Sequence, residues 1–272
     1  LDALSILAQA GGDFDGHTPT GSTWGVFAAE AAGLHLEARR GPHGWTLQGT
    51  KPWCSLAAHL TNALVTASLD SGERGLFAVD LRDAGVRPHP GPWVARGMPD
   101  VVSAPVDFDD VPAVAVGAPG WYLSRPGFAW GGISVAACWW GAALGLAEPL
   151  LAAARGERAD QVALVHVGRV DAALWGARAV LAEAAVLVDA TVHVEHAATI
   201  GDRLLAERVR AVVAEAAGLT LSETDAALGP APLVADLAHA RRAADLHLYL
   251  RQHHALRDAA RIGRDVVAGA GA

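Results

Sequence analysis

Residues 47–57 read Leu-Gln-Gly-Thr-Lys-Pro-Trp-Cys-Ser-Leu-Ala, and they include Lys51, the only lysine of the chain. The pattern predicts a strand that turns at Gly49 and continues as a second apolar segment. On a strand, Trp53 and Ser55 would point to the same side because they lie two residues apart. An indole beside a hydroxyl suits a flat ligand with a polar edge, and a core tryptophan beside a turn serine is the alternative.

The first part of the chain around this stretch has the patterning of short strands. Apolar residues alternate with polar ones from Trp24 onward, and Pro42-His-Gly44 predicts a hairpin turn. A short helix, Leu1 to Ala10, precedes this region and is stopped by Gly11-Gly12. We expect strands at residues 34–38, 45–48, 62–69, 75–81 and 101–108. Their spacing predicts a small barrel or sandwich.

The second part of the chain, after Gly120, is helical throughout. Long amphipathic segments are expected at residues 125–151, 160–189, 201–222 and 233–262, with short links that predict a four-helix bundle. Pro126 to Ala147 carries no charged residue and is long enough to span a membrane. Because no other segment qualifies, we predict a buried bundle helix there and keep a membrane span as the alternative.

The composition excludes several classes of partner. The chain has 272 residues, 52% of them hydrophobic, and a formal net charge of −8, which argues against binding nucleic acid or an anionic membrane. The two cysteines, Cys54 and Cys138, are expected to be free thiols in a reducing cytoplasm. No signal peptide is recognised at the start.

Residues 47–57 resemble the Gly-x-Lys-x-aromatic-x-Ser/Thr segment of the acyl-CoA dehydrogenase family. Other pieces follow in the order of that family. Ala29-Glu30 stands where the family has a Thr-Glu-Pro segment, and Gly97-Met98 with Val106 to Pro112 resembles the run that closes its middle domain. The helix Arg125 to Leu151 resembles the first helix of the family's C-terminal bundle.

The resemblance covers the chain from Leu1 to Gly263 and implies an α+β fold. It implies a remnant of an N-terminal helical domain at 1–22, a β-barrel middle domain at 23–120 and a C-terminal four-helix bundle at 121–272. It also implies FAD as cofactor, an acyl thioester as substrate, an electron acceptor or flavin reductase as partner, and a homodimer or homotetramer.

The cofactor-binding residues that the resemblance implies are Trp53, Cys54, Ser55 and Glu30. Trp53 would stack on the isoalloxazine ring, and Ser55 would bond near its N5. Cys54 would face the opposite side of the strand from both, so a small core residue is the interpretation that the strand pattern favours.

The last predicted helix carries the candidate catalytic residues. His253 falls on a mostly apolar face with Tyr249 and Leu250, where burial would lower its pKa and favour the neutral imidazole. An ordinary core histidine is the alternative. Steps of four, three and four predict a separate polar face, whose members are His247, Arg251, His254 and Asp258.

Counting from Asp245, His253 takes the place of the glutamate that removes the α-proton in the family, and His254 takes the place of its glycine. The resemblance therefore implies His253 as the acid/base, with His254 and Arg251 as supporting groups. Because flavin monooxygenases of the same fold often carry a histidine near this place, a monooxygenase is the second hypothesis. A non-catalytic scaffold is the third.

Two features of the family are missing, and no metal is expected. The arginine segment that holds the flavin diphosphate is reduced to Arg155-Gly-Glu-Arg158, and the glycine turn before the last helix is reduced to Gly229-Pro-Ala-Pro232. His193 and His196 lie three residues apart, but no cysteine or well-placed carboxylate accompanies them.

Overall fold

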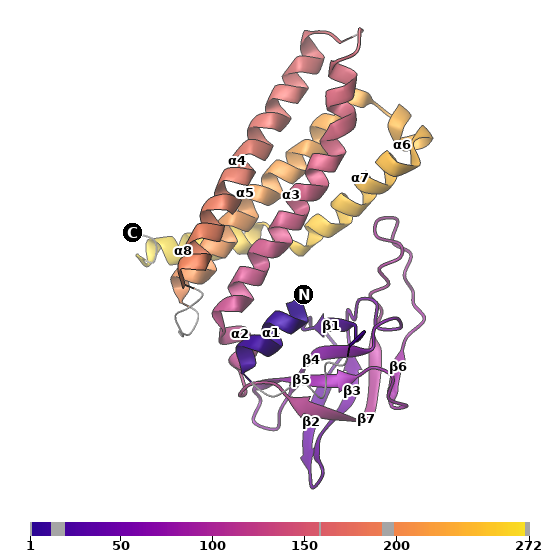
Figure 1. Ribbon diagram of the computed structural model, residues 1–272, viewed down its shortest axis with the longest axis vertical. Helices are drawn as coiled ribbons and strands as arrows, with labels where there is room; N and C mark the ends of the chain where they lie inside the picture. The colour runs from indigo at the N-terminus through magenta and orange to yellow at the C-terminus, as the bar shows by residue number, and fades with distance from the viewer. Residues whose placement is uncertain (1, 12–19, 158, 192–198, 270–272) are drawn as a thin grey trace. The chain divides into compact units, whose positions relative to one another are not determined.

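The computed structural model describes residues 2–11, 20–157, 159–191 and 199–269. The chain forms two compact units: Leu1–Ala95 with Pro99–Arg125, and Arg96–Met98 with Pro126–Ala272. Strands build the first unit and helices the second (Figure 1).

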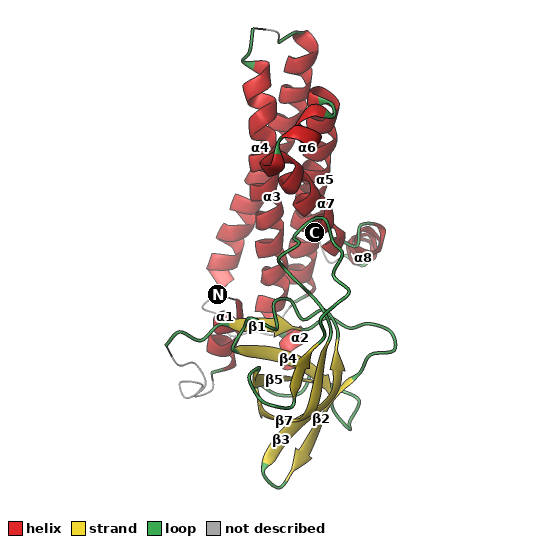
Figure 2. Ribbon diagram, turned by 90° about the vertical axis from the view of Figure 1, so that its right-hand side faces the viewer, coloured by secondary structure: helices red, strands yellow, loops and turns green. Residues whose placement is uncertain are grey.

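The first unit contains a closed barrel, as predicted. Five strands follow one another in the order β4-β2-β3-β7-β5, and β5 pairs with β4 to close the ring (Figure 2). β1 pairs in parallel with β4, and β6 pairs with β7. The strands are β1 (Trp24–Phe27), β2 (Leu36–Gly41), β3 (Gly44–Lys51), β4 (Asn62–Ser68), β5 (Arg74–Asp80), β6 (Val86–Pro88) and β7 (Val106–Ala115).

The predicted hairpin turn is confirmed, because β2 and β3 are joined across Pro42 and His43. Leu36 and Ala38 of β2 and Leu47 of β3 are buried in the barrel core. Gly49 has φ 120°, and a Cβ there would collide with the carbonyl oxygen of residue 35. Only glycine therefore fits this irregular point of β3.

Two strand predictions are corrected. β3 ends at Lys51, so the second apolar segment is a series of turns, and β7 begins at Val106 although we expected a strand over 101–108. The amide of Cys54 donates to the carbonyl oxygen of Ala104 at 3.1 Å. The segment after β3 and the segment before β7 thus pair backbone groups that lie outside the hydrogen-bond ladder of the barrel.

Two short helices belong to the first unit. α1 (Asp2–Ala10) confirms the predicted first helix, and α2 (Trp121–Ser124) closes the unit. Ile6 of α1 and Tyr122 of α2 share a core with Leu64 and Leu76 of the sheet. This second core covers one outer face of the barrel.

The second unit confirms the predicted bundle, which α3, α4, α5 and α7 build around one core. Trp139, Leu146 and Leu246 are fully buried in that core. The helices are α3 (Pro126–Ala154), α4 (Gln161–Thr191), α5 (Ile200–Leu228), α6 (Ala231–Ala235), α7 (Leu237–Tyr249), the 3₁₀ turn η2 (Leu250–Gln252) and α8 (Leu256–Val267).

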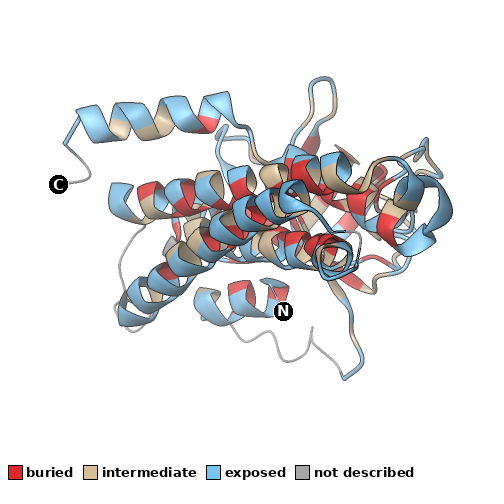
Figure 3. Ribbon diagram, turned by 90° about the horizontal axis from the view of Figure 1, so that it is seen from above, coloured by how far each residue is buried: buried red, intermediate tan, exposed pale blue. Residues whose placement is uncertain are grey.

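The prediction of one last helix over 233–262 is wrong. The chain leaves the helix at His253, passes through Ala255 with φ 40°, and starts again as α8. Neither proline nor glycine occurs between Leu237 and Arg261, so the sequence showed no break. α8, which leads to the C terminus, is exposed along most of its length (Figure 3).

Within the described part of the chain, one helix is long and apolar enough to span a membrane, Gly127–Ala154 with a mean hydropathy of 1.4. This helix, α3, packs against α4, α5 and α7, as a core helix of a bundle does. Some of its large apolar side chains, such as Leu144 and Leu151, stay exposed.

Candidate functional site

Lys51, the only lysine of the chain, is the last residue of β3. Lys51 Nζ donates to Glu30 Oε1 at 2.7 Å and to Thr66 Oγ1 at 2.8 Å. Burial lowers the pKa of Lys51, and the hydrogen bond and charge of Glu30 oppose that shift. Glu30, which we predicted to bind the cofactor, is therefore the counterion of a buried ammonium in this unit.

Trp53 stands in a turn and not on the predicted strand. Its φ is 58°, in the left-handed region that bulky residues rarely adopt, and 57% of the residue is exposed. The argument that strand alternation places Trp53 and Ser55 on one side does not apply. The alternative of a core tryptophan is also wrong. An exposed indole on a strained turn fits a flat ligand that could cover one of its faces.

Cys54 points into the barrel core, as the strand pattern favoured. Its thiol donates to the carbonyl oxygen of Lys51 at 3.3 Å, and burial raises its pKa to about 12. Its amide is engaged by Ala104. Neither group is left for a ligand, so of the two interpretations of Cys54 this geometry supports the core residue.

Ser55 belongs to a pair of hydroxyls. Ser55 Oγ lies 2.7 Å from Ser103 Oγ, and Ser103 Oγ in turn donates to the carbonyl oxygen of Val101 at 3.1 Å. With the Ser103 proton directed to that carbonyl, Ser55 donates to Ser103 and keeps lone pairs for another donor. Sequence reasoning missed Ser103, because nothing near it in the chain indicates a partner 48 residues away.

His253 lies in the break between η2 and α8, in the second unit. Its Nδ1 is 3.1 Å from Asp258 Oδ2, although the ring nitrogen and the oxygen are not aligned as a hydrogen bond. Burial lowers the pKa of His253, and the nearby Asp258 carboxylate opposes that shift. The predicted direction is confirmed, although the cause is a buried loop position rather than an apolar helix face.

Asp258 is buried and is held from three sides. Besides His253, its Oδ2 accepts the amide hydrogen of His254 at 3.1 Å, and its Oδ1 pairs with the Arg261 guanidinium. Arg261 Nε also donates to Glu207 Oε1 of α5 at 2.6 Å. This chain of charges ties α8 to α5 and fixes the carboxylate beside the imidazole.

The predicted polar face of the last helix is wrong. Arg251 and His254 are exposed, whereas Asp258 is buried, and the break at His253 separates His254 and Asp258 from α7. The backbone amide of His254 donates to Asp258. The supporting roles of the Arg251 and His254 side chains stay predictions.

Two residues that the sequence did not indicate, Trp139 and Arg210, lie near His253. The buried Trp139 ring packs edge-on to the His253 ring at 6.1 Å and to the Tyr249 ring at 6.2 Å. The Arg210 guanidinium lies 4.6 Å from the Trp139 ring centre. Trp139 belongs to α3 and Arg210 to α5, so no spacing in the sequence brings them to His253.

In the parts of the chain that the structure describes, no group of three metal-binding side chains occurs. His193 and His196 lie outside the described residues. Among the described histidines, His239 is buried, while His247 and His254 are exposed.

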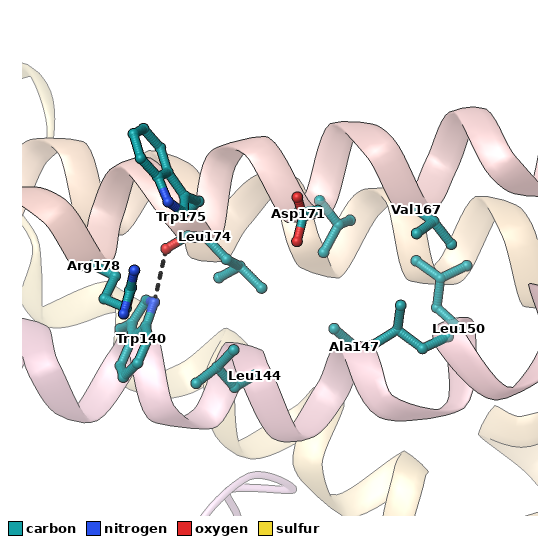
Figure 4. A pocket seen from close by; sticks show the side chains of 11 residues that line it. Trp140, Leu144, Ala147, Leu150, Val167, Asp171, Leu174, Trp175 and Arg178 are labelled. Carbon is teal, nitrogen blue, oxygen red and sulfur yellow. Dashed lines mark hydrogen bonds between the residues drawn. The ribbon is translucent and has the colours of Figure 1, made fainter.

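A separate apolar groove of about 230 Å³ runs between α3 and α4 (Figure 4). Leu144, Leu174 and the largely exposed Trp175 line it, with Asp171 and Arg178 among its polar residues. Neither Trp53 nor His253 contributes to this groove. It is thus an apolar surface of the bundle apart from the candidate residues.

Comparison with known proteins supports the fold. No family model and no curated protein matches the sequence. FMN-bound TdsC from Paenibacillus sp. A11-2 is similar with a TM-score of 0.78 and 18% identity, covering 98% of this chain and 78% of that one. A related crystal structure names TdsC a dibenzothiophene monooxygenase.

Two further solved structures have the same fold. A variant of the Tcur3481-Tcur3483 steroid ACAD is similar with a TM-score of 0.80 and 19% identity, covering 100% of this chain and 76% of that one. KijD3 in complex with FMN and a dTDP-sugar is similar with a TM-score of 0.77 and 19% identity, covering 98% of this chain and 70% of that one. The resemblance to the acyl-CoA dehydrogenase fold is thereby confirmed.

Proposed function

We propose that this protein is a flavin-dependent oxidoreductase that dehydrogenates an acyl thioester between its α and β carbons, with His253 as the base. The His253–Asp258 pair carries the proposal, because a partly buried imidazole with a carboxylate partner stands where the resembling family places its catalytic glutamate. The fold shared with flavin-binding proteins supports the choice of cofactor.

The turn after β3 fits the flat ring of a flavin. Trp53 offers an exposed aromatic face, and the Ser55 hydroxyl keeps lone pairs for a ring N–H. A bound flavin would supply the two-electron chemistry that no side chain of this protein provides. FAD is the form that the resemblance implies, whereas FMN is present in the similar structures of TdsC and KijD3.

The imidazole supplies the proton transfer. Burial favours its neutral form, which can accept the proton from the carbon next to the thioester carbonyl as that C–H bond breaks. The imidazolium that results is stabilised by Asp258, whose position the Arg261–Glu207 contact maintains. A flavin, which Trp53 and Ser55 would hold, would supply the acceptor for the hydride that leaves the β carbon.

A flavin monooxygenase is the second candidate. A histidine in place of the family's glutamate favours it, and a dibenzothiophene monooxygenase is among the proteins of similar fold. In that case a partner reductase would deliver reduced flavin, and His253 would assist the reaction with oxygen. We further propose a cytoplasmic homo-oligomer assembled through the bundle.

Anaerobic mixing with a panel of acyl-CoAs tests the dehydrogenase. Flavin-loaded parent protein should lose its visible absorbance with at least one thioester, and His253→Ala should lose this reaction by roughly 10²–10⁴-fold in rate. Bleaching that survives His253→Ala would show that another residue is the base. No bleaching, combined with turnover of supplied reduced flavin and oxygen, would favour the monooxygenase. No flavin binding at all would leave a non-catalytic scaffold.

A further inference from the structure

Arg210 of α5 contacts the backbone immediately before His253. Its Nη2 donates to the carbonyl oxygen of Gln252 at 3.0 Å, and its Nη1 donates to that of Gly132 in α3 at 3.1 Å. The two bonds connect α5, α3 and the break after α7 through one planar group. A guanidinium can make both at once because its donors are arranged in a rigid fork.

The same guanidinium lies over the ring of Trp139, the residue that packs edge-on against His253. At 4.6 Å from the ring centre, the cation is within the range of a cation–π interaction. Arg210 therefore supports the His253 loop twice, through its bond to the Gln252 carbonyl and through its contact with Trp139, which packs against the imidazole.

We infer that Arg210 is a positioning residue that holds the His253 loop in its extended form between η2 and α8. The inference rests on the proposed role of His253 in proton transfer. Without the hydrogen bonds of Arg210, which we call the tether, the Gln252 carbonyl loses a charged donor and the loop can follow a different path from Tyr249 to α8.

Charged and titratable groups reach this region from every element around it. Burial lowers the pKa of His253 most, Asp258 raises it, and the Arg210 cation lowers it further. The surrounding groups are Cys138 on α3, Glu207 and Arg210 on α5, Tyr249 on α7, His254 in the loop, and Asp258 and Arg261 on α8.

Hydrogen exchange in the flavin-free protein tests the tether. The His253 amide donates to the Leu250 carbonyl and the His254 amide donates to Asp258, so both report whether the loop keeps its form. In Arg210→Met these two amides should exchange about tenfold faster or more, as expected for losing a hydrogen bond to a charged group. Amides of α4 should keep the parental rate and so exclude unfolding of the whole bundle.

Two variants give the comparison its controls. Arg208→Met removes an exposed arginine from the same helix and should leave both amides unchanged. Arg210→Lys keeps the charge but not the planar fork, so it should also accelerate exchange. Exchange in Arg210→Met equal to that in Arg208→Met would overturn the proposal, and parental exchange in Arg210→Lys would show that charge alone matters.

NMR titration of the imidazole gives a second readout that a purely structural residue would not change. The pKa of His253 should rise in Arg210→Met, because the cation that disfavours protonation is removed and the loop gains solvent. An unchanged or lower pKa would contradict the inference. Neither measurement uses flavin or substrate, so failure of the tether is distinguishable from failure of the proposed reaction.

Discussion

Replacing Trp53 with alanine should weaken flavin binding and leave the fold intact. The residue is 57% exposed, so little of its area contributes to the barrel core. A fully covered tryptophan buries about 150–250 Å², of which roughly half remains here for a ligand. A ring stacked on one face covers only part of that area.

At about 25 cal/mol per Å², covering 40–70 Å² stabilises the complex by roughly 1–2 kcal/mol. Aromatic stacking adds about 0.5–1.5 kcal/mol, so the expected loss is roughly 1.5–3.5 kcal/mol. Each 1.4 kcal/mol is about tenfold in Kd, which predicts flavin binding about 10- to 300-fold weaker in Trp53→Ala.

Fluorescence titration with FMN and FAD measures this change, and urea unfolding measures stability in parallel. Stability should stay within about 1 kcal/mol of the parent, because the left-handed φ of Trp53 is strained and truncation removes little packing. Trp175→Ala is the matched control, since Trp175 is 64% exposed and belongs to α4 of the other unit. Equal flavin affinity in Trp53→Ala, Trp175→Ala and the parent would refute the reasoning.

Three further predictions concern the catalytic pair, the thiols and the assembly. Asp258→Asn should lower the pKa of His253, because it removes the carboxylate that favours protonation of the imidazole. The acid limb of the kcat/KM profile should therefore move to lower pH. The control Asp265→Asn breaks a different ion pair of α8 and should leave this limb unchanged. Asp258→Asn should also reduce the free energy of unfolding by about 1–3 kcal/mol in urea titrations. The loss is limited to this range because asparagine keeps one acceptor oxygen and Arg261 keeps its bond to Glu207. At pH 8, iodoacetamide should label the exposed Cys138 and spare buried Cys54, whose pKa is about 12, as read by peptide mass spectrometry. The apolar groove between α3 and α4 predicts a dimer or larger species, and a single monomeric boundary in sedimentation at micromolar concentration would contradict it.

Most of the fold could be predicted from local patterns in the sequence. Alternation with glycine and proline turns predicted the barrel region, including the turn at Pro42, and long apolar periodicity predicted α3, α4 and α5. These features depend on residues near one another in the chain, so the sequence shows them directly. Counting from Asp245 along the pattern of the resembling family singled out His253, and burial lowers its pKa in the expected direction. Its role as the base stays a prediction.

The form of the candidate site was decided by contacts between distant residues. Ser55 pairs with Ser103 across 48 residues, and Arg261 binds Glu207 across 54. Distant partners also hold the backbone here: the amide of Cys54 next to Trp53 donates to Ala104, and the Gln252 carbonyl before the break accepts from Arg210. Periodicity describes one element at a time, and only the folded chain determines which side chains meet.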